Sequence, residues 1–525
     1  MRIAVLRGPR FYTGDPQQPW TDALAVAEGR IVAAGQAAET WAEAPGASVE
    51  HLDGPLVIPA FTDAHIHLLW YGQSLDELDL RGLDRAAFHA ALRKAVARTE
   101  AGQWIVGRGW DQNRWADGRF PTAAELDILA PRHPLFLVAK SAHVAVVNSV
   151  ALRRAGLSAQ TPDPPHGRLG RHADGTLNGL LFESAIERVQ QAMPAPTVTE
   201  AAEALARAQA HLLQSGITAI HDMDGGPAFA AFRLLEEEGR LHLHIVKYLP
   251  DVELETLRAV GLRSGFGSER LRFGGLKRFA DGALGSRTAA LFAPYEGEPD
   301  NVGLLTLERE SLERLAFDAA SSGVALAVHA IGDRANALVI DVLTEARRRA
   351  PRLRQRIEHV QLLAEGDAER LARAGLVASM QPIHAVHDRP MAERYWGART
   401  ARAYAWRTLR RAGAVLAFGS DAPVEPWSPW LGLYAAVTRR HEADGAPGRE
   451  GWHPDQRLTL EEAIGAYTWG AACAAGEEHE RGLLRVGYAA DLLLLDRDIF
   501  RLPPEALLET RVRRVMIGGR WYEPG

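Results

Sequence analysis

Short apolar runs alternate with helical stretches through the middle of the chain. The runs are rich in β-branched and other apolar residues, and the stretches between them carry apolar residues at helical spacing. The predicted strands are residues 60–67, 216–223, 242–249, 271–281, 323–332, 356–362, 376–382 and 415–422. Strand–helix alternation implies parallel pairing, and eight such units close a barrel. The pattern therefore predicts an α/β protein built on a (β/α)8 TIM barrel.

The clearest predicted helix has Thr199 as its N-cap and an apolar stripe of Leu205, Leu212 and Leu213, and it ends before Gly216. Further helices are expected over residues 333–349, 365–374 and 458–475.

Both ends of the chain differ from the middle, because they show short predicted strands joined by tight turns. Strands are expected over residues 2–6, 23–27, 30–34, 491–495, 512–517 and 520–522. Two or three strands are marginally stable alone, so the ends are expected to pair. We predict a small β-sandwich domain made of residues 1–58 with 482–525, and a barrel domain over residues 59–481.

One long interval interrupts the alternation of barrel strands and helices. Residues 68–198 separate the first two strand–helix units, where a barrel loop usually has about 2–6 residues. The interval carries Trp70, Trp104, Trp110 and Trp115. Long structured insertions at the mouth of a barrel commonly cover substrate, so a lid is expected here.

Composition excludes several classes of protein. Of 525 residues 47% are hydrophobic and 24% charged, and the net charge is −6 with Arg and Glu interleaved. This argues against a nucleic-acid partner, and no apolar run approaches the roughly 20 residues that span a membrane. A single cysteine, Cys473, agrees with a reducing compartment. We expect a cytoplasmic protein with a small-molecule substrate, and a homodimer as the candidate assembly.

Ionisable residues recur where the predicted strands end. His65 and His67 stand two apart on the first strand, so both point to one side at a spacing that suits chelation of a cation. The others are Lys277 on strand four, His329 on five, His359 on six and Asp421 on eight. The C-terminal strand ends of a barrel meet around one axis, so these groups are expected to converge. For each residue alone, an ordinary core or polar role is the alternative.

This series resembles the amidohydrolase superfamily, which has His-x-His on strand one, Lys on four, His on five and six, and Asp on eight. The longer phrases are similar to its family-three, YtcJ-type branch. They are FTDAHIHL, LKRFADGALGSRTA, VHAIGDRA, RIEHVQL and FGSDAPVEP. The resemblance implies a hydrolase holding one or two divalent ions, with Zn²⁺ expected. It places His65, His67 and Asp421 on the more buried ion, and His329 and His359 on the second.

Lys277 would bridge two ions if its amine is carboxylated to N6-carboxylysine, as the resemblance implies. Only four of the 60 basic residues are lysines, and an amine can become neutral where a guanidinium cannot. An ion pair of Lys277 with Asp281 or Glu358 is the alternative, and a single-metal site also stays open.

Metal chemistry then suggests a mechanism. A bound ion of this type lowers the pKa of its water from about 15.7 toward about 7. Asp421 is expected to take that proton and pass it to the leaving amine, although a purely structural ligand role for Asp421 is the alternative.

Candidates on the substrate side are weaker. Trp110, Asp111 and His143 combine flat apolar surface with hydrogen-bonding groups, but they also suit the core of the insertion. Arg287 is a candidate for reading a carboxylate or carbonyl, with a structural ion pair as its alternative. His384, after strand seven, is expected to contact substrate or oxyanion.

The preferred function is hydrolysis of a C–N bond in an amide, an N-acyl amine or an N-formyl amine. Deamination of a cyclic amidine uses the same metal constellation and is the enzymatic alternative. A metal-binding barrel with a regulatory role is the non-catalytic alternative.

Overall fold

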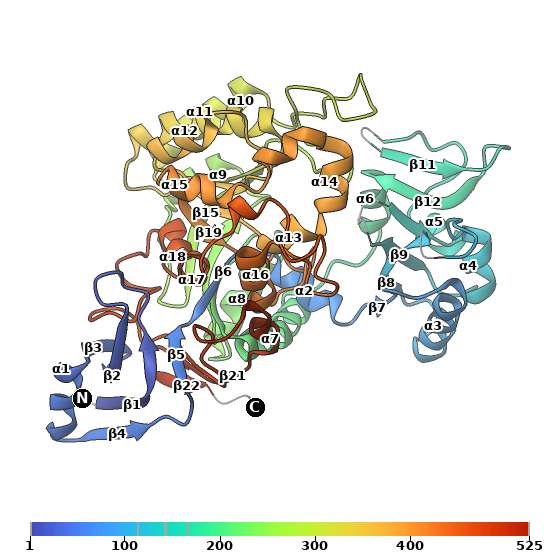
Figure 1. The fold of residues 1–525 in the computed structure, drawn as a ribbon. Coiled ribbons are helices and arrows are strands. Elements are labelled where there is room, and N and C mark those ends of the chain that lie inside the picture. The colour runs from blue at the N-terminus through green and yellow to red at the C-terminus, as the bar shows by residue number, and fades with distance from the viewer. Residues whose placement is uncertain (1–2, 113–114, 141–143, 165–166, 523–525) are drawn as a thin grey trace. The chain divides into compact units, whose positions relative to one another are not determined.

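The computed structural model describes residues 3–112, 115–140, 144–164 and 167–522. The chain divides into two compact units (Figure 1). One comprises Met1–Gly72 with Val198–Gly525, and the other comprises Gln73–Thr197. In the described part of the chain, no helix is both long and apolar enough to cross a membrane.

The first unit contains an eight-stranded parallel sheet in the order β19-β18-β17-β16-β15-β14-β13-β6. The strands are β6 (Phe61–Ile66), β13 (Ile217–Asp222), β14 (His244–Leu249), β15 (Leu271–Phe279), β16 (Ala325–Ala330), β17 (Arg356–His359), β18 (Val377–Met380) and β19 (Val415–Phe418). Each lies within a strand that the hydrophobic pattern predicts. The predicted (β/α)8 barrel is therefore confirmed.

The barrel closes where the end of β6 meets the segment after β19. The N–H of Asp421 donates to the carbonyl of His65 at 2.7 Å, and the N–H of His67 donates to the carbonyl of Ala422 at 2.9 Å. The two segments approach so closely at Gly419 that a Cβ there would lie 2.4 Å from the His65 nitrogen. Glycine is thus required at the seam, and the seam brings Asp421 beside the His-x-His motif.

Helices follow the barrel strands, including those predicted over residues 333–349 and 365–374. They are α7 (Val198–Ser215), α8 (Ala228–Glu237), α9 (Leu254–Val260), α10 (Arg309–Ser322), α11 (Asp333–Arg349), α12 (Asp367–Arg373), α13 (Pro382–His387), α14 (Arg389–Trp396), α15 (Trp406–Arg411), α16 (Pro429–Thr438), α17 (Leu460–Tyr467) and α18 (Trp469–Ala475). The helix predicted to start after Thr199 begins at Val198, so Thr199 lies inside it and is not its N-cap. The predicted stripe of α7 is fully buried at Leu205, Leu212 and Leu213.

The single helix predicted over residues 458–475 is wrong, because the chain breaks into α17 and α18 at Thr468. Thr468 has φ −125° and ψ −93°, outside the helical region. Its hydroxyl donates to the Ile464 carbonyl at 2.9 Å. Gly470 then packs so tightly that a Cβ would lie 2.0 Å from the Leu416 carbonyl of β19. Close packing on the barrel therefore overrides a continuous helical pattern.

Strands from both chain ends form one further sheet in the order β22-β21-β20-β5-β1-β2-β3, with β4 also paired to β1. They are β1 (Ile3–Tyr12), β2 (Trp20–Ala27), β3 (Arg30–Ala34), β4 (Ala47–His51), β5 (Leu56–Pro59), β20 (Leu492–Leu495), β21 (Val512–Ile517) and β22 (Arg520–Tyr522), and the short helix α1 (Gln36–Thr40) follows β3. The antiparallel pair β5–β20 joins the two ends of the chain.

Strand β20 also joins this sheet to the barrel. Successive side chains of a strand point to opposite faces. Leu492 and Leu494 belong to the core of the terminal sheet, whereas Leu493 and Leu495 belong to the barrel core. All four are buried, so one short strand contributes to two cores.

The second unit has a six-stranded sheet of its own, in the order β11-β12-β10-β9-β8-β7. Its strands are β7 (Leu78–Asp79), β8 (Ile105–Trp110), β9 (Leu135–Ala139), β10 (Val144–Val147), β11 (Gly167–Arg171) and β12 (Leu177–Glu183). Its helices are α3 (Arg85–Arg98), α4 (Ala123–Leu129), α5 (Ser149–Arg154) and α6 (Ala185–Gln190), while α2 (Leu68–Ser74) leads into it from β6. The role of this insertion as a lid stays a prediction.

The double role of β20 gives a stability prediction. Leu493→Ala should lower the free energy of unfolding by about 2–5 kcal/mol, because it leaves a cavity in the barrel core. Urea unfolding followed by tryptophan fluorescence measures the loss. Leu502→Ala is the control, since Leu502 is 43% exposed and should change stability by about 0.5 kcal/mol or less. Equal effects of the two substitutions would contradict this account of β20.

Candidate metal centre

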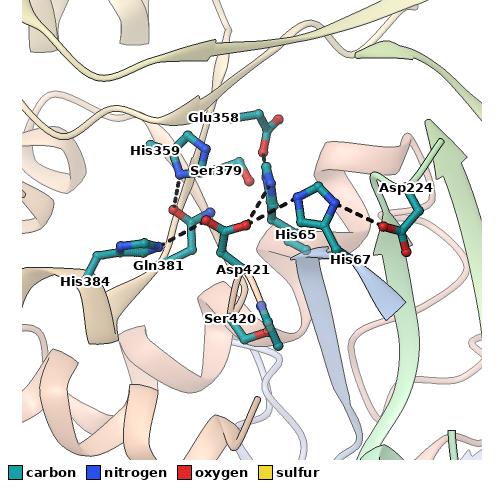
Figure 2. Close-up of polar contacts among 12 residues, drawn as sticks. His65, His67, Asp224, Glu358, His359, Ser379, Gln381, His384, Ser420 and Asp421 are labelled. Carbon is teal, nitrogen blue, oxygen red and sulfur yellow. Dashed lines mark hydrogen bonds and ion pairs between the residues drawn. The ribbon is translucent and has the colours of Figure 1, made fainter. Parts of the chain in front are cut away.

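Two imidazoles and one carboxylate meet at the barrel seam (Figure 2). The Nε2 atoms of His65 and His67 each lie 3.5 Å from Oδ1 of Asp421. Ligand atoms bound at about 2.0–2.2 Å to one tetrahedral ion lie about 3.4 Å apart. The three donor atoms therefore fit a single divalent cation.

The other nitrogen of each imidazole is already engaged. Nδ1 of His65 donates to Glu358 Oε2 at 2.6 Å, and Nδ1 of His67 lies 3.3 Å from Asp224 Oδ1. A proton held on Nδ1 leaves the Nε2 lone pair free toward Asp421, which is the usual carboxylate–imidazole–metal arrangement. Burial lowers the pKa of His65, which favours the neutral form that a cation requires.

Glu358 is held in turn by Arg356, which is fully buried. The guanidinium donates to Glu358 Oε1 at 2.6 Å, and also to Ser379 Oγ at 2.7 Å and to the Ala64 carbonyl at 2.5 Å. Burial would raise the pKa of Glu358, but the charge of Arg356 and the hydrogen bond from His65 hold that pKa well below its usual range. The carboxylate thus stays ionised beneath the site.

His329 and His359 lie next to each other, with ring centroids 4.6 Å apart, and the His359 ring lies 4.9 Å from that of His65. His359 donates through Nδ1 to Gln381 Oε1 at 2.8 Å, and His329 donates through Nε2 to the Gly282 carbonyl at 2.9 Å. Nε2 of His359 and Nδ1 of His329 are left as lone pairs. Burial lowers the pKa of His329 to about 3, so its imidazole is neutral.

Lys277 is buried, and its Nζ lies 3.9 Å from the centroid of the Phe279 ring. Among the described residues no carboxylate oxygen lies within 4.0 Å of Nζ, so neither ion pair considered for Lys277 is present. Glu358 is bonded to Arg356, and Asp281 accepts backbone N–H groups, including that of Gly332 at 2.8 Å. Burial lowers the pKa of Lys277 to about 8, which brings the neutral amine within reach.

The two carboxylate oxygens of Asp421 face different partners. Oδ1 faces His65 and His67, and Oδ2 lies 3.2 Å from Nε2 of His384, whose Nδ1 lies 3.6 Å from Asp388 Oδ2. Burial opposes charge on His384, but the carboxylates on both sides raise its pKa well above the usual value. This direction favours the protonated ring, which donates through Nε2 to Asp421.

The backbone at the centre is strained. Asp421 has φ 60° and His359 has φ 73°. Residues other than glycine rarely adopt this left-handed region, and such strain is retained mainly where surrounding structure and function require it. Here it occurs at the last residue of β17 and three residues beyond the end of β19, where both side chains join the centre.

Two of the remaining predicted substrate contacts have the structural roles that were their alternatives. Trp110 is fully buried in the core of the insertion, where its indole N–H donates to the Leu137 carbonyl at 2.9 Å, which supports the packing alternative. Arg287 forms an ion pair with Glu298 at 3.1 Å, which supports the structural alternative for this residue. Asp111 is half-buried after β8, and His143 lies outside the described residues.

Three contributors to the centre are missing from the sequence prediction, namely Arg356, Asp224 and Gln381. Arg356 and Glu358 stand two apart on β17, so the strand period alone places them on one face. Asp224 and Gln381 follow the ends of β13 and β18, the same kind of position as the predicted ligands. The strand-end position of Asp224 and Gln381 could be recognised from the sequence. The imidazole that each of them contacts could not.

Comparisons with known proteins find similarity over nearly the whole chain. Residues 49–521 match the model of the Amidohydrolase family. The chain is 32% identical to the putative amidohydrolase YtcJ of Bacillus subtilis, over 98% of each chain. It is 28% identical to the N-substituted formamide deformylase of Arthrobacter pascens, over 99% of this chain and 98% of that one. A solved metal-dependent hydrolase from Pyrococcus horikoshii superposes with a TM-score of 0.83 at 31% identity, covering 96% and 99% of the two chains.

The hydrogen bond to His359 can be tested separately from the ligands. Gln381→Met keeps the approximate side-chain size but removes the acceptor for Nδ1, so the apparent metal affinity should fall about 10- to 100-fold. Competition with a chromophoric chelator measures it.

Gln361→Met is the matched control for this substitution. Gln361 is also a buried glutamine that follows β17, and its Oε1 accepts no hydrogen bond in the described part of the chain. Its substitution should leave the affinity near the wild-type value. Equal affinities for both variants would show that Gln381 does not orient a ligand.

Proposed function

This chain belongs to the amidohydrolase family and is a metal-dependent hydrolase of that family, and from that premise we propose that it hydrolyses a C–N bond of a small amide, N-acyl amine or N-formyl amine. The observation that carries the proposal is the division of the Asp421 carboxylate between the paired imidazoles and the cationic His384. The similarity to a formamide deformylase supports the choice of bond.

The donor set fits divalent metal ions, and Zn²⁺ is our proposal. One ion would be held by His65, His67 and Asp421, and a second by His329 and His359, because these side chains present the free lone pairs. When bound, such an ion brings the pKa of its water toward about 7 and polarises a carbonyl group.

Asp421 is our candidate for proton transfer. Its carboxylate is ionised, because His384 and nearby imidazoles hold its pKa well below the usual range although burial acts in the opposite direction. It can accept a proton from the attacking water and return it to the leaving nitrogen, as general acid–base catalysis requires. His384 positions this carboxylate and supplies positive charge beside the carbonyl under attack.

Lys277 is our candidate for carboxylation. The neutral amine nitrogen would attack carbon dioxide, forming an N–C bond and releasing one proton, and the product carries two oxygens and a negative charge. This chemistry needs an amine that is neutral near physiological pH, and burial supplies it by lowering the pKa of Lys277 to about 8. No carboxylate among the described residues pairs with Nζ and holds the amine protonated.

A substrate panel tests the proposed bond. Metal-loaded protein should release amine from N-formyl amines or N-acyl amino acids. Release of ammonia from aminopurines, with no turnover of the amides, would favour deamination instead. No turnover of any compound would favour the regulatory alternative. His65→Ala serves as the control, because it removes one donor of the Asp421 set.

Metal dependence gives the next prediction. Prolonged treatment with a chelator should abolish hydrolysis of whichever substrate the panel identifies, and addition of Zn²⁺ or another first-row divalent ion should restore it, because imidazole and carboxylate ligands accept several such ions. Rates and metal content are followed together. Full activity in metal-free protein would refute the proposal.

Substitution of Lys277 separates one metal ion from two. Lys277→Ala should lose most activity and about one of the two ions of the main centre, and formate or acetate should restore part of the activity by supplying the missing oxygens. Lys277→Arg should lower metal affinity about 10- to 100-fold or more, since a guanidinium stays protonated and repels cations.

Lys94→Arg is the matched control, because Lys94 is exposed on α3. It should behave as the wild type. An active Lys277→Arg variant with full metal content would leave a single-ion enzyme built on the histidines and Asp421.

A further inference from the structure

A second group of metal-ligand side chains lies in the barrel unit, outside the set around Asp421. It consists of His387 at the end of α13, Glu425 in the segment after β19, and His441 and Glu442 in the segment after α16. One ligand atom from each of His387, His441 and Glu442 lies within 4.8 Å of the others. His387, His441 and Glu442 are the candidate ligands of an accessory site.

His387 has the same orientation as the ligands of the main centre. Its Nδ1 lies 2.6 Å from Glu425 Oε2, and its Nε2 lies 3.2 Å from both carboxylate oxygens of Glu442. Without a metal both ring nitrogens carry protons, because the two carboxylates outweigh burial and raise the pKa of His387 to about 9. A binding ion would displace the proton from Nε2, while the proton on Nδ1 stays directed at Glu425. This repeats the pairing of His65 with Glu358, in which a carboxylate fixes the ring and frees the far nitrogen.

His441 supplies a second nitrogen at the same place. Its ring stacks on His387 with centroids 4.7 Å apart and planes 26° from parallel. Nδ1 of His441 lies 3.8 Å from Glu442 Oε2 and 3.7 Å from Asp444 Oδ1, and it accepts the N–H of Ala443 at 3.1 Å. Because Nδ1 of His441 accepts this hydrogen bond, it carries a lone pair, and a cation could bind that lone pair in place of the N–H group.

The surrounding charge favours a cation. Glu425, Glu442 and Asp444 bring three carboxylates together, and in the described ranges their only ion-pair partners are the imidazoles of His387 and His441. None is paired with an arginine or lysine, although the chain has 60 such residues. Although burial opposes charge on His387, Glu425 and Glu442 raise its pKa to about 9, so without a metal its ring carries a positive charge that offsets only part of the three negative charges. A divalent ion would displace the proton from Nε2 and offset most of the negative charge.

Arg439, two residues before His441, anchors the segment that carries His441 and Glu442. Arg439 is fully buried, and its guanidinium donates to the carbonyl of Tyr404 at 2.9 Å and to that of Trp452 at 2.8 Å. The ligand side chains themselves remain 21–32% exposed for His387, Glu442 and His441. A fixed backbone with partly exposed side chains suits a site that an ion enters from solvent.

We propose that His387, His441 and Glu442 bind one divalent first-row transition-metal ion, such as Zn²⁺, at an accessory site distinct from the centre around Asp421. Glu425 orients His387 without being a ligand. Two nitrogen donors favour such an ion over Mg²⁺ or Ca²⁺, which prefer oxygen. Since α13 also carries His384, the ion would tie the helix that positions Asp421 to the 441–442 segment.

Metal counting tests the proposal. Wild-type protein, Glu442→Gln and His441→Ala are equilibrated in buffered Zn²⁺, and zinc per chain is measured by plasma mass spectrometry. The wild type should hold one equivalent more than either variant. A crystal of the wild type should show a zinc anomalous peak between His387 and Glu442, absent from Glu442→Gln crystals.

Two controls separate this site from others. His89→Ala removes an imidazole paired with Glu125 at 2.5 Å at similar exposure, but without a third ligand in the described residues, so its zinc count should match the wild type. His65→Ala should lose zinc from the main centre and keep the accessory ion. Equal zinc counts in wild type, Glu442→Gln and His441→Ala, or an anomalous peak that survives in Glu442→Gln, would overturn the proposal.

Discussion

The whole centre depends on the contact between the end of the first barrel strand and the segment after the last. Two backbone hydrogen bonds and a glycine without room for a Cβ hold these segments together. They place Asp421 3.5 Å from both histidines of the His-x-His motif. Residues more than 350 positions apart thus come together as one candidate metal site only because the barrel closes.

Such a cluster is costly to bury, and the barrel interior contains the groups that offset the cost. Charge removed from water must be paired and hydrogen-bonded. Arg356 satisfies Glu358, Glu358 fixes His65, and His384 satisfies the second oxygen of Asp421. Each ligand therefore has a partner behind it. This arrangement fixes which imidazole nitrogen is free, which decides where a cation can bind.

Lys277 is the exception to this pairing. Its amine lies against an aromatic ring, with no described carboxylate within ion-pair distance, and burial lowers its pKa to about 8. A buried lysine in this state supplies the neutral amine that the proposed carboxylation requires. The contrast with the fully paired Lys247, 2.7 Å from Asp222, shows that the barrel can neutralise a buried lysine when the role is structural.

Local patterns along the chain predict the eight strands, the pairing of the chain ends and the strand-end positions of the ligand-type residues, because strand period, turn residues and strand–helix alternation are local properties. Tertiary structure decided the rest. The break at Thr468 follows from packing of Gly470 on β19, and the burial of Trp110 follows from the core of the insertion. The pairing of His384 with Asp421 and of His65 with Glu358 joins distant segments. No local pattern specifies which distant side chain a given nitrogen will face, and only the closed barrel fixes it.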